Sequence, residues 1–241
     1  EVSRYSFDFF SDYIYLATYL FAALIQIFNF GILIFLKIKK PKPLKVLIRP
    51  LSKILIRKTV IIAILAASVG YSLMSFIMTA TPLQIVNVCK LGDSASATVI
   101  QWHVIAMFAP SFFTGSIINL LGNRKVMMMG VMLYIMSICF GIMGQTIQYF
   151  WISLFLCGLG WNFLYVGGSD IIAKSALPEE RAKVQGVTDF IIFIFVASGS
   201  FLAGSLHSNL GWEIMMLYTS IPIFILFLSI VFINPREIKP T

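Results

Sequence analysis

The segment from Val126 to Ser169 contains no charged residue over 44 consecutive positions. A helix crosses the hydrocarbon core of a bilayer with about 20 mostly apolar residues. The segment is therefore too long for one crossing and predicts two, joined between Gly144 and Gln148. The rest of the chain is similar, because 59% of its residues are hydrophobic and 12% are charged, whereas a soluble domain carries about 25% charged residues. The sequence predicts an integral membrane protein.

Apolar segments of spanning length recur along the whole chain. Within lipid each segment must satisfy its own backbone polar groups, which a helix does, and the alternating pattern of a membrane barrel is absent. We therefore predict an all-α polytopic membrane helix bundle of seven spans. The predicted spans are residues 13–36, 60–80, 98–118, 126–144, 149–172, 187–206 and 214–233.

The basic residues predict the orientation of these spans. Of the 18 Lys and Arg residues, nine lie from Lys37 to Lys58, without an acid among them. Because cytoplasmic loops carry the excess of Lys and Arg, this segment is predicted to be cytoplasmic, with the N-terminus outside and the C-terminus inside. Three parts result: a tail and first span (1–36), a basic linker (37–58) and a six-helix region (59–241).

The net charge of +8 follows from this topology and calls for no nucleic acid. Apolar residues interleave with the basic residues of the linker, which favours contact with anionic membrane lipid. The chain has three cysteines, Cys89, Cys139 and Cys157, and shows no metal-ligand cluster and no phosphate-binding loop. We therefore predict no metal, no cofactor and no enzymatic activity. An outside N-terminus without a signal sequence also leads us to expect further sequence upstream.

One polar, basic break separates two apolar stretches between Gly115 and Lys125. It has a glycine at 115, Asn119 four positions later, Gly122, and then Arg124 and Lys125. A glycine lets two helices approach closely, a second glycine makes a tight turn, and cations hold the turn in the cytoplasm. The spacing resembles the hairpin signature of the major facilitator superfamily. Residues 99–115, 158–169 and 178–186 resemble a bacterial subgroup of these permeases.

The resemblance runs from about residue 60 to residue 233 and implies the C-terminal half of a permease in a bacterial cytoplasmic membrane. Residues 13–36 would be helix six, and helices one to five would be missing. Such a transporter moves a small organic solute by alternating access between its two halves. The resemblance also implies that the hairpin around Gly115 packs against helix five of the other half. Helix five is thus an expected partner that is missing from this chain.

The hairpin departs from the family signature at its charges. Asn119 replaces an acid, Leu120 replaces a cation, and Asn123 moves the terminal cations one position later. Lys174 falls where the family has an acid, and Asp170 lies one helical turn before it and can pair with it. We expect the charge network that closes the cytoplasmic side to be weakened or rewired.

Polar and aromatic residues deep within the spans are the candidates for solute contact. Gln101, Trp102 and His103 either line an outer vestibule or bond between helices. Trp161, Asn162 and Tyr165 lie in the middle of a span, and Asn162 is either a solute contact or an interhelical bond. Tyr71, Ser72 and Ser75 either face the same cavity or simply pack.

Asp189 is the acid nearest the start of a span. It either couples solute movement to protons, because desolvation raises the pKa of a carboxylate, or pairs with Arg181, Lys183 or Arg124. Two rival readings of the whole chain remain open. It is a non-transporting remnant or assembly partner of a major facilitator protein, or, more remotely, a heptahelical receptor. A retinal protein needs a lysine in its last span, and residues 214–233 contain none.

Overall fold

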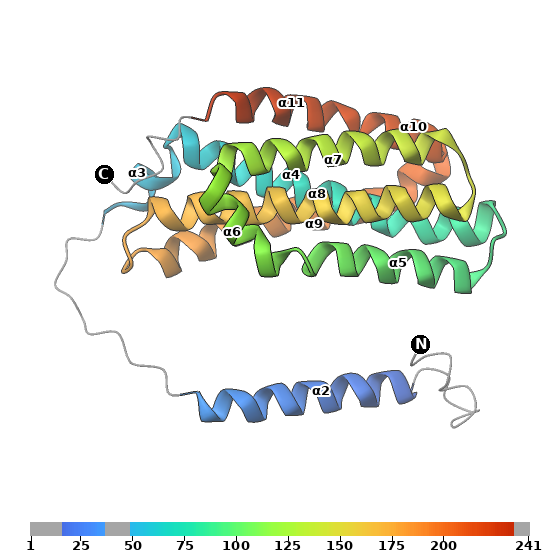
Figure 1. The fold of residues 1–241 in the computed structure, drawn as a ribbon, viewed down its shortest axis with the longest axis horizontal. Coiled ribbons are helices and arrows are strands. Elements are labelled where there is room, and N and C mark those ends of the chain that lie inside the picture. The colour runs from blue at the N-terminus through green and yellow to red at the C-terminus, as the bar shows by residue number, and fades with distance from the viewer. Residues whose placement is uncertain (1–15, 37–48, 234–241) are drawn as a thin grey trace. The chain divides into compact units, whose positions relative to one another are not determined.

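The computed structural model describes residues 16–36 and 49–233. Helices make up almost all of this part, and no strand occurs in it, which confirms the predicted all-α fold. The helices are α2 (Leu16–Phe35), α3 (Leu51–Leu55), α4 (Lys58–Pro82), the π-helical turn η1 (Leu83–Val88), α5 (Asp93–Phe108), α6 (Ser111–Leu121), α7 (Asn123–Met143), α8 (Ile147–Ser175), α9 (Arg181–Leu210), α10 (Trp212–Tyr218) and α11 (Ser220–Val231) (Figure 1).

In the described part, six helices are long and apolar enough to cross a membrane, or seven spans if the bent pair α5 and α6 counts as one. The chain is thus an integral membrane protein. The predicted continuous span at 98–118 is wrong in one respect, because α5 and α6 meet at an angle of 44°. Pro110 lies at this bend, where its missing backbone N–H interrupts the helical hydrogen bonds. The start of the first predicted span, residues 13–15, lies outside the described residues.

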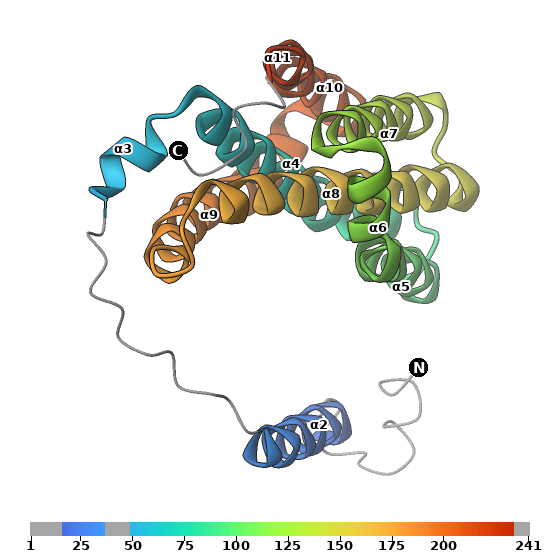
Figure 2. The same cartoon turned by 60° about the vertical axis from the view of Figure 1, so that its left-hand side comes forward.

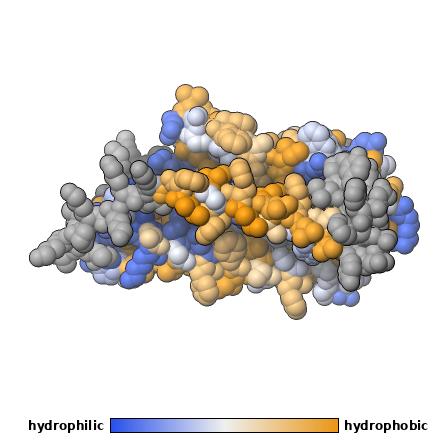
Figure 3. All heavy atoms as spheres, turned by 90° about the horizontal axis from the view of Figure 1, so that it is seen from below, coloured by the Kyte–Doolittle hydropathy of each residue, from blue (hydrophilic) through white to orange (hydrophobic). Residues whose placement is uncertain are grey.

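The chain forms two compact units, Glu1–Val46 and Leu47–Thr241. Among the described residues of the first unit, α2 is the sole helix, and none of its side chains is buried. Its exposed apolar side chains include Phe28 and Phe35. Apolar residues of this kind are coloured orange in Figure 3. A helix that is apolar on all sides is suited to contact with lipid or other spans.

In the second unit, α8 lies between α7, α4 and α5, and α4 also packs against α9 and α11 (Figure 2). The crossing of α7 and α8 is close because both helices carry a glycine there. A Cβ atom added to Gly160 would lie 2.9 Å from the carbonyl oxygen of Gly130, and one added to Gly130 would lie 2.9 Å from that of Gly160. Tyr134 joins α7 to α4 by donating its hydroxyl hydrogen to the carbonyl oxygen of Gly70 at 2.6 Å.

Candidate functional site

The turn between α6 and α7 carries the hairpin signature. Gly122 has a φ of 85°, a left-handed conformation that favours glycine, as the sequence predicted for the turn. Asn123 follows and is 6% exposed. Its Nδ2 donates to the carbonyl oxygen of Gly167 at 3.0 Å and to Oδ2 of Asp170 at 2.8 Å. Asn123 thus fastens the hairpin to α8.

Asp170 also accepts a hydrogen bond from Nζ of Lys174 at 2.5 Å, so the predicted pair is present. The amide of Asn123 and the ammonium of Lys174 therefore donate to the same carboxylate oxygen, Oδ2. The sequence alone indicates Asn123 only as an insertion that displaces the terminal cations. Asn123 directly follows the turn glycine, where a side chain is directed towards the following helix. This position is the sequence signal for its role.

Most of the other signature residues lie at the surface of the described bundle. A Cβ atom added to Gly115 would meet no described atom within 4 Å. Asn119 and Lys125 are exposed and Arg124 is half-buried. Gly115 is therefore not a close-packing position within the described part of the chain.

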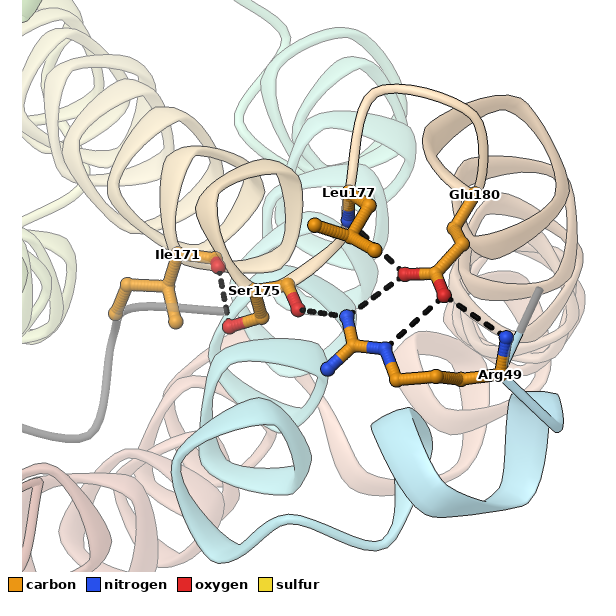
Figure 4. Close-up of polar contacts among 5 residues, drawn as sticks. All are labelled: Arg49, Ile171, Ser175, Leu177 and Glu180. Atoms are coloured by element: carbon orange, nitrogen blue, oxygen red, sulfur yellow. Dashed lines mark hydrogen bonds and ion pairs between the residues drawn. The ribbon is translucent and has the colours of Figure 1, made fainter. Parts of the chain in front are cut away.

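The linker reaches the bundle through a clasp, which we define as Arg49 and Glu180 with Ser175 and Leu177 (Figure 4). The guanidinium of Arg49 donates through Nε to Oε1 of Glu180 at 3.0 Å and through Nη2 to Oε2 at 2.7 Å. The backbone N–H of Arg49 adds a bond to Oε1 at 3.0 Å, and that of Leu177 adds one to Oε2 at 3.0 Å. Nη2 of Arg49 also lies 3.5 Å from the carbonyl oxygen of Ser175.

Glu180 is 2% exposed and precedes α9, so the clasp joins the linker to the turn between α8 and α9. The hydrogen bond from the Arg49 side chain, with the backbone bonds and the opposite charge, lowers the pKa of Glu180 to about 2. In α3, Ile54 is 1% exposed and belongs to the hydrophobic core. This end of the linker is therefore fixed on the bundle, while residues 37–48, for which lipid contact was predicted, lie outside the described residues.

Asp189 on α9 is half-buried and accepts a hydrogen bond from Nε2 of Gln185 at 2.9 Å. Within the described residues, the cations predicted as its partners, Arg181, Lys183 and Arg124, form no ion pair with it. Gln185 precedes Asp189 by four residues and therefore shares its face of the helix.

Asn162 on α8 is fully buried at the bend between α5 and α6. Its Nδ2 donates to the carbonyl oxygen of Met107 at 2.7 Å and to Oγ of Ser111 at 2.6 Å. Its Oδ1 accepts a hydrogen bond from Thr114 at 2.7 Å. This arrangement is the interhelical alternative for Asn162, and its donors and acceptor are occupied by neighbouring helices.

An aromatic cluster lies where α4, α5, α8 and α9 meet, and we call it the aromatic face: Tyr71, Phe108, Trp161, Tyr165 and Phe193. The rings of Trp161 and Tyr165 stack with centroids 5.2 Å apart, and Tyr71 meets both edge-on at 5.1 Å and 5.5 Å. Phe108 and Phe193 extend the cluster and are more than half exposed. Trp161 is 4% exposed, yet its Nε1–H has no hydrogen-bond partner in the described part. A buried N–H without a partner is costly in an apolar surrounding.

The three consecutive candidates on α5 diverge, as helical geometry requires. His103 is fully buried and its Nδ1 lies 2.6 Å from the carbonyl oxygen of Leu154, so Nδ1 carries the hydrogen and bonds to α8. Gln101 is exposed, and Trp102 meets the ring of Trp151 at 5.8 Å.

The serines of α4 bind to α9. Oγ of Ser75 lies 2.6 Å from Oγ of Ser200, and Ser72 donates to the carbonyl oxygen of Phe195 at 2.8 Å. Both are bonds between helices, and the aromatic face joins Tyr71 of the same helix to the candidates on α8.

The chain matches the family model described as Major Facilitator Superfamily over residues 63–241. It is 43% identical over 165 residues to the riboflavin transporter RfnT of Brucella anthropi, covering 68% of this chain and 41% of that protein. It is also 32% identical over 152 residues to YdeG of Bacillus subtilis, an uncharacterized transporter of the same type, covering 61% of this chain and 35% of the relative. The chain thus spans about two fifths of the length of these relatives. It belongs to the major facilitator superfamily, of which it represents part of a permease.

Proposed function

We propose that this chain is the C-terminal half of a secondary transporter that moves a small organic solute by alternating access, without covalent chemistry. The observation that carries the proposal is the aromatic face with its unpaired indole N–H on α8. The family assignment and the names of the relatives, which describe transporters, support the same function. In this reading, the aromatic face forms one wall of the solute path, and the other half of the transporter supplies the opposite wall.

The aromatic face also suggests the solute class. Trp161 and Tyr165 offer stacked rings, Tyr71 adds an edge, and the Trp161 N–H is a donor in an apolar site. These groups suit a planar aromatic solute that carries a hydrogen-bond acceptor. Riboflavin is the first solute to test, because the relative from Brucella anthropi is named as its transporter.

The chain is oriented in this proposal with the clasp in the cytoplasm of a bacterium and the N-terminus outside. The charges of the described helices support it. The end of the bundle that carries the clasp also bears Lys53, Lys58, Arg124 and Lys174, whereas the loops at the opposite end bear Lys90, Asp93 and Glu213. This is the asymmetry that the positive-inside rule describes.

Uptake by a riboflavin-requiring bacterium tests the function. The chain alone is compared with a chimera in which residues 59–241 follow the N-terminal half of the Brucella anthropi transporter. We expect the chimera to support growth on low riboflavin and the chain alone to fail, because alternating access needs two halves. A chimera that reaches the membrane but imports no riboflavin would contradict this solute. Failure with other planar aromatic solutes as well would favour the non-transporting remnant.

The indole N–H can be tested in the same chimera. Trp161→Phe keeps a stacking ring and removes the donor, so we expect the KM for riboflavin uptake to rise about tenfold, the change for one lost hydrogen bond. Trp151→Phe is the matched control, because Trp151 is on the same helix and packs against Trp102 and Phe155, away from the aromatic face. Equal KM values for the two variants would show that the Trp161 N–H does not bind the solute.

Gly115 provides a further prediction about the missing half. Since a Cβ atom at Gly115 meets no described atom within 4 Å, we expect Gly115→Leu to leave the thermal unfolding of the chain unchanged. In the chimera, the same substitution should abolish uptake, because the family places helix five against this glycine. Gly204→Leu is the control, since a Cβ atom there also meets open space. Unaltered uptake by the Gly115→Leu chimera would show that no helix packs at this position.

A further inference from the structure

A chain of polar side chains ties together the distal end of the bundle, which we define as the end where η1 leads to α5, α7 turns into α8, and α9 turns into α10. Nε2 of His207 on α9 donates to Oε1 of Gln84 on η1 at 2.8 Å. Nε2 of Gln84 donates to Oε1 of Gln145 at 3.1 Å, and Nε2 of Gln145 donates to Oε1 of Glu213 on α10 at 3.3 Å. We call these four residues the distal relay.

The donors and acceptors of the distal relay run in one direction. Each amide accepts through its oxygen and donates through its nitrogen, so the relay runs from the imidazole to the carboxylate without a conflict. Gln84 is the central member, is 3% exposed, and connects segments that are far apart in the sequence. Burial makes the loss of a partner costly, because the freed polar group cannot bind water.

The backbone that carries Gln84 departs from regular helix. Residues 83–88 form a π-helical turn directly after Pro82 in α4, and Lys90 then adopts a φ of 55°, which is rare for a residue with a side chain. Single π-helical turns often mark functional positions in helices. The distal relay therefore holds the irregular segment of the second unit against α9 and α10.

A groove lies beside this segment. It has a volume of about 710 Å³ and is lined by η1 residues such as Asn87 together with Ser208, Trp212 and other residues of the α9–α10 region. Close packing would fix η1 by contact alone. Here hydrogen bonds hold η1 beside open space.

We propose that the distal relay is a latch and that Gln84 is its positioning residue. When the relay is intact, η1 is held against α9 and the turn between α7 and α8. When it opens, η1 moves into the groove and the loop that follows is released. The latch belongs to this half of the molecule and does not depend on the identity of the solute.

A natural thiol reports on the latch. Cys89 follows η1, and its Sγ lies 3.3 Å from Oε1 of Gln145 and 3.5 Å from Nε2 of Gln84. Among the described residues, the hydrogen bonds that link His207 to Cys89 run through the amides of the relay. A change in the reactivity of Cys89 on substitution of His207 therefore reports coupling through Gln84.

The experiment uses the purified full chain with Cys139→Ser and Cys157→Ala, so that Cys89 is the single thiol. We measure its rate of reaction with a charged maleimide. His207→Ala should raise the rate about fivefold, which corresponds to the loss of one hydrogen bond. His207→Gln should restore the original rate, because the glutamine amide can place a donor where Nε2 of histidine lies. A purely packing role for the ring would not be rescued in this way.

Asn209→Ala is the matched control at the same end of α9, because the Asn209 amide bonds only to Ser205 in the described part. Glu213→Ala tests the exposed end of the relay with less risk to folding and should also raise the rate. Backbone hydrogen exchange of residues 83–92 gives a second readout. If neither His207→Ala nor Glu213→Ala changes the Cys89 rate or this exchange, the latch is disproved. Both readouts need no transported solute, so a failed riboflavin assay leaves this result interpretable.

Discussion

Arg49→Ala is expected to destabilise the second unit by about 2–3 kcal/mol, the cost of leaving a charged hydrogen-bonding group without its partner. The variant leaves the Glu180 carboxylate, 2% exposed, without the guanidinium that holds both of its oxygens. Thermal unfolding of the purified chain in detergent measures the loss. Arg49→Lys should recover only part of it, because an ammonium group cannot make the two parallel bonds.

Lys53→Ala is the control, because Lys53 is an exposed linker cation four residues after Arg49. Equal melting temperatures for Arg49→Ala and Lys53→Ala would show that the clasp adds nothing to stability.

Unfolding at acid pH gives an independent check of the clasp. Because the pKa of Glu180 is lowered from 4.5 to about 2, its stabilisation is present above the ordinary pKa and is lost as the pH falls from about 4.5 towards 2. Glu180→Gln should remove this part of the acid sensitivity.

Asn162→Leu is expected to destabilise the same unit by about 2 kcal/mol or more. The substitution keeps the approximate volume of the side chain but leaves Met107, Ser111 and Thr114 without their shared partner at the bend. We expect a lower midpoint of thermal unfolding in the absence of any solute. Such a result separates a bond between helices from a solute contact.

Gln101→Leu is the matched control for this prediction. It makes the same change of an amide to a leucine on α5, at an exposed position. If Asn162→Leu melted like Gln101→Leu and yet lowered riboflavin uptake by the chimera, the side chain would belong to the solute path instead.

The fold was predictable to a large extent, because the lengths of apolar segments between charges determine how many helices a membrane can hold. The angle between α5 and α6 was not predictable, although Pro110 marked the position of the bend. A proline shows where a helix can bend, but the groups freed at this bend are bonded by Asn162, which comes from a distant part of the sequence.

The candidate site was predictable only in part for a similar reason. The neighbours of Asp170 on its own helix are fixed by spacing, so its pair with Lys174 could be read from the sequence. Glu180, the partner of Arg49, and His207, one partner of Gln84, each lie more than a hundred residues away. One sequence does not indicate which distant polar groups meet, so the clasp and the distal relay emerge only from the three-dimensional arrangement.

The reciprocal contact of Gly130 and Gly160 constrains how this protein can evolve. Each added Cβ atom would meet a carbonyl oxygen of the main chain, and no substitution makes a main chain smaller. A change at one glycine therefore cannot be compensated at the other, unlike a change in two packed side chains. Among relatives that keep this crossing, we expect both glycines to stay fixed while the aromatic face diversifies with the solute.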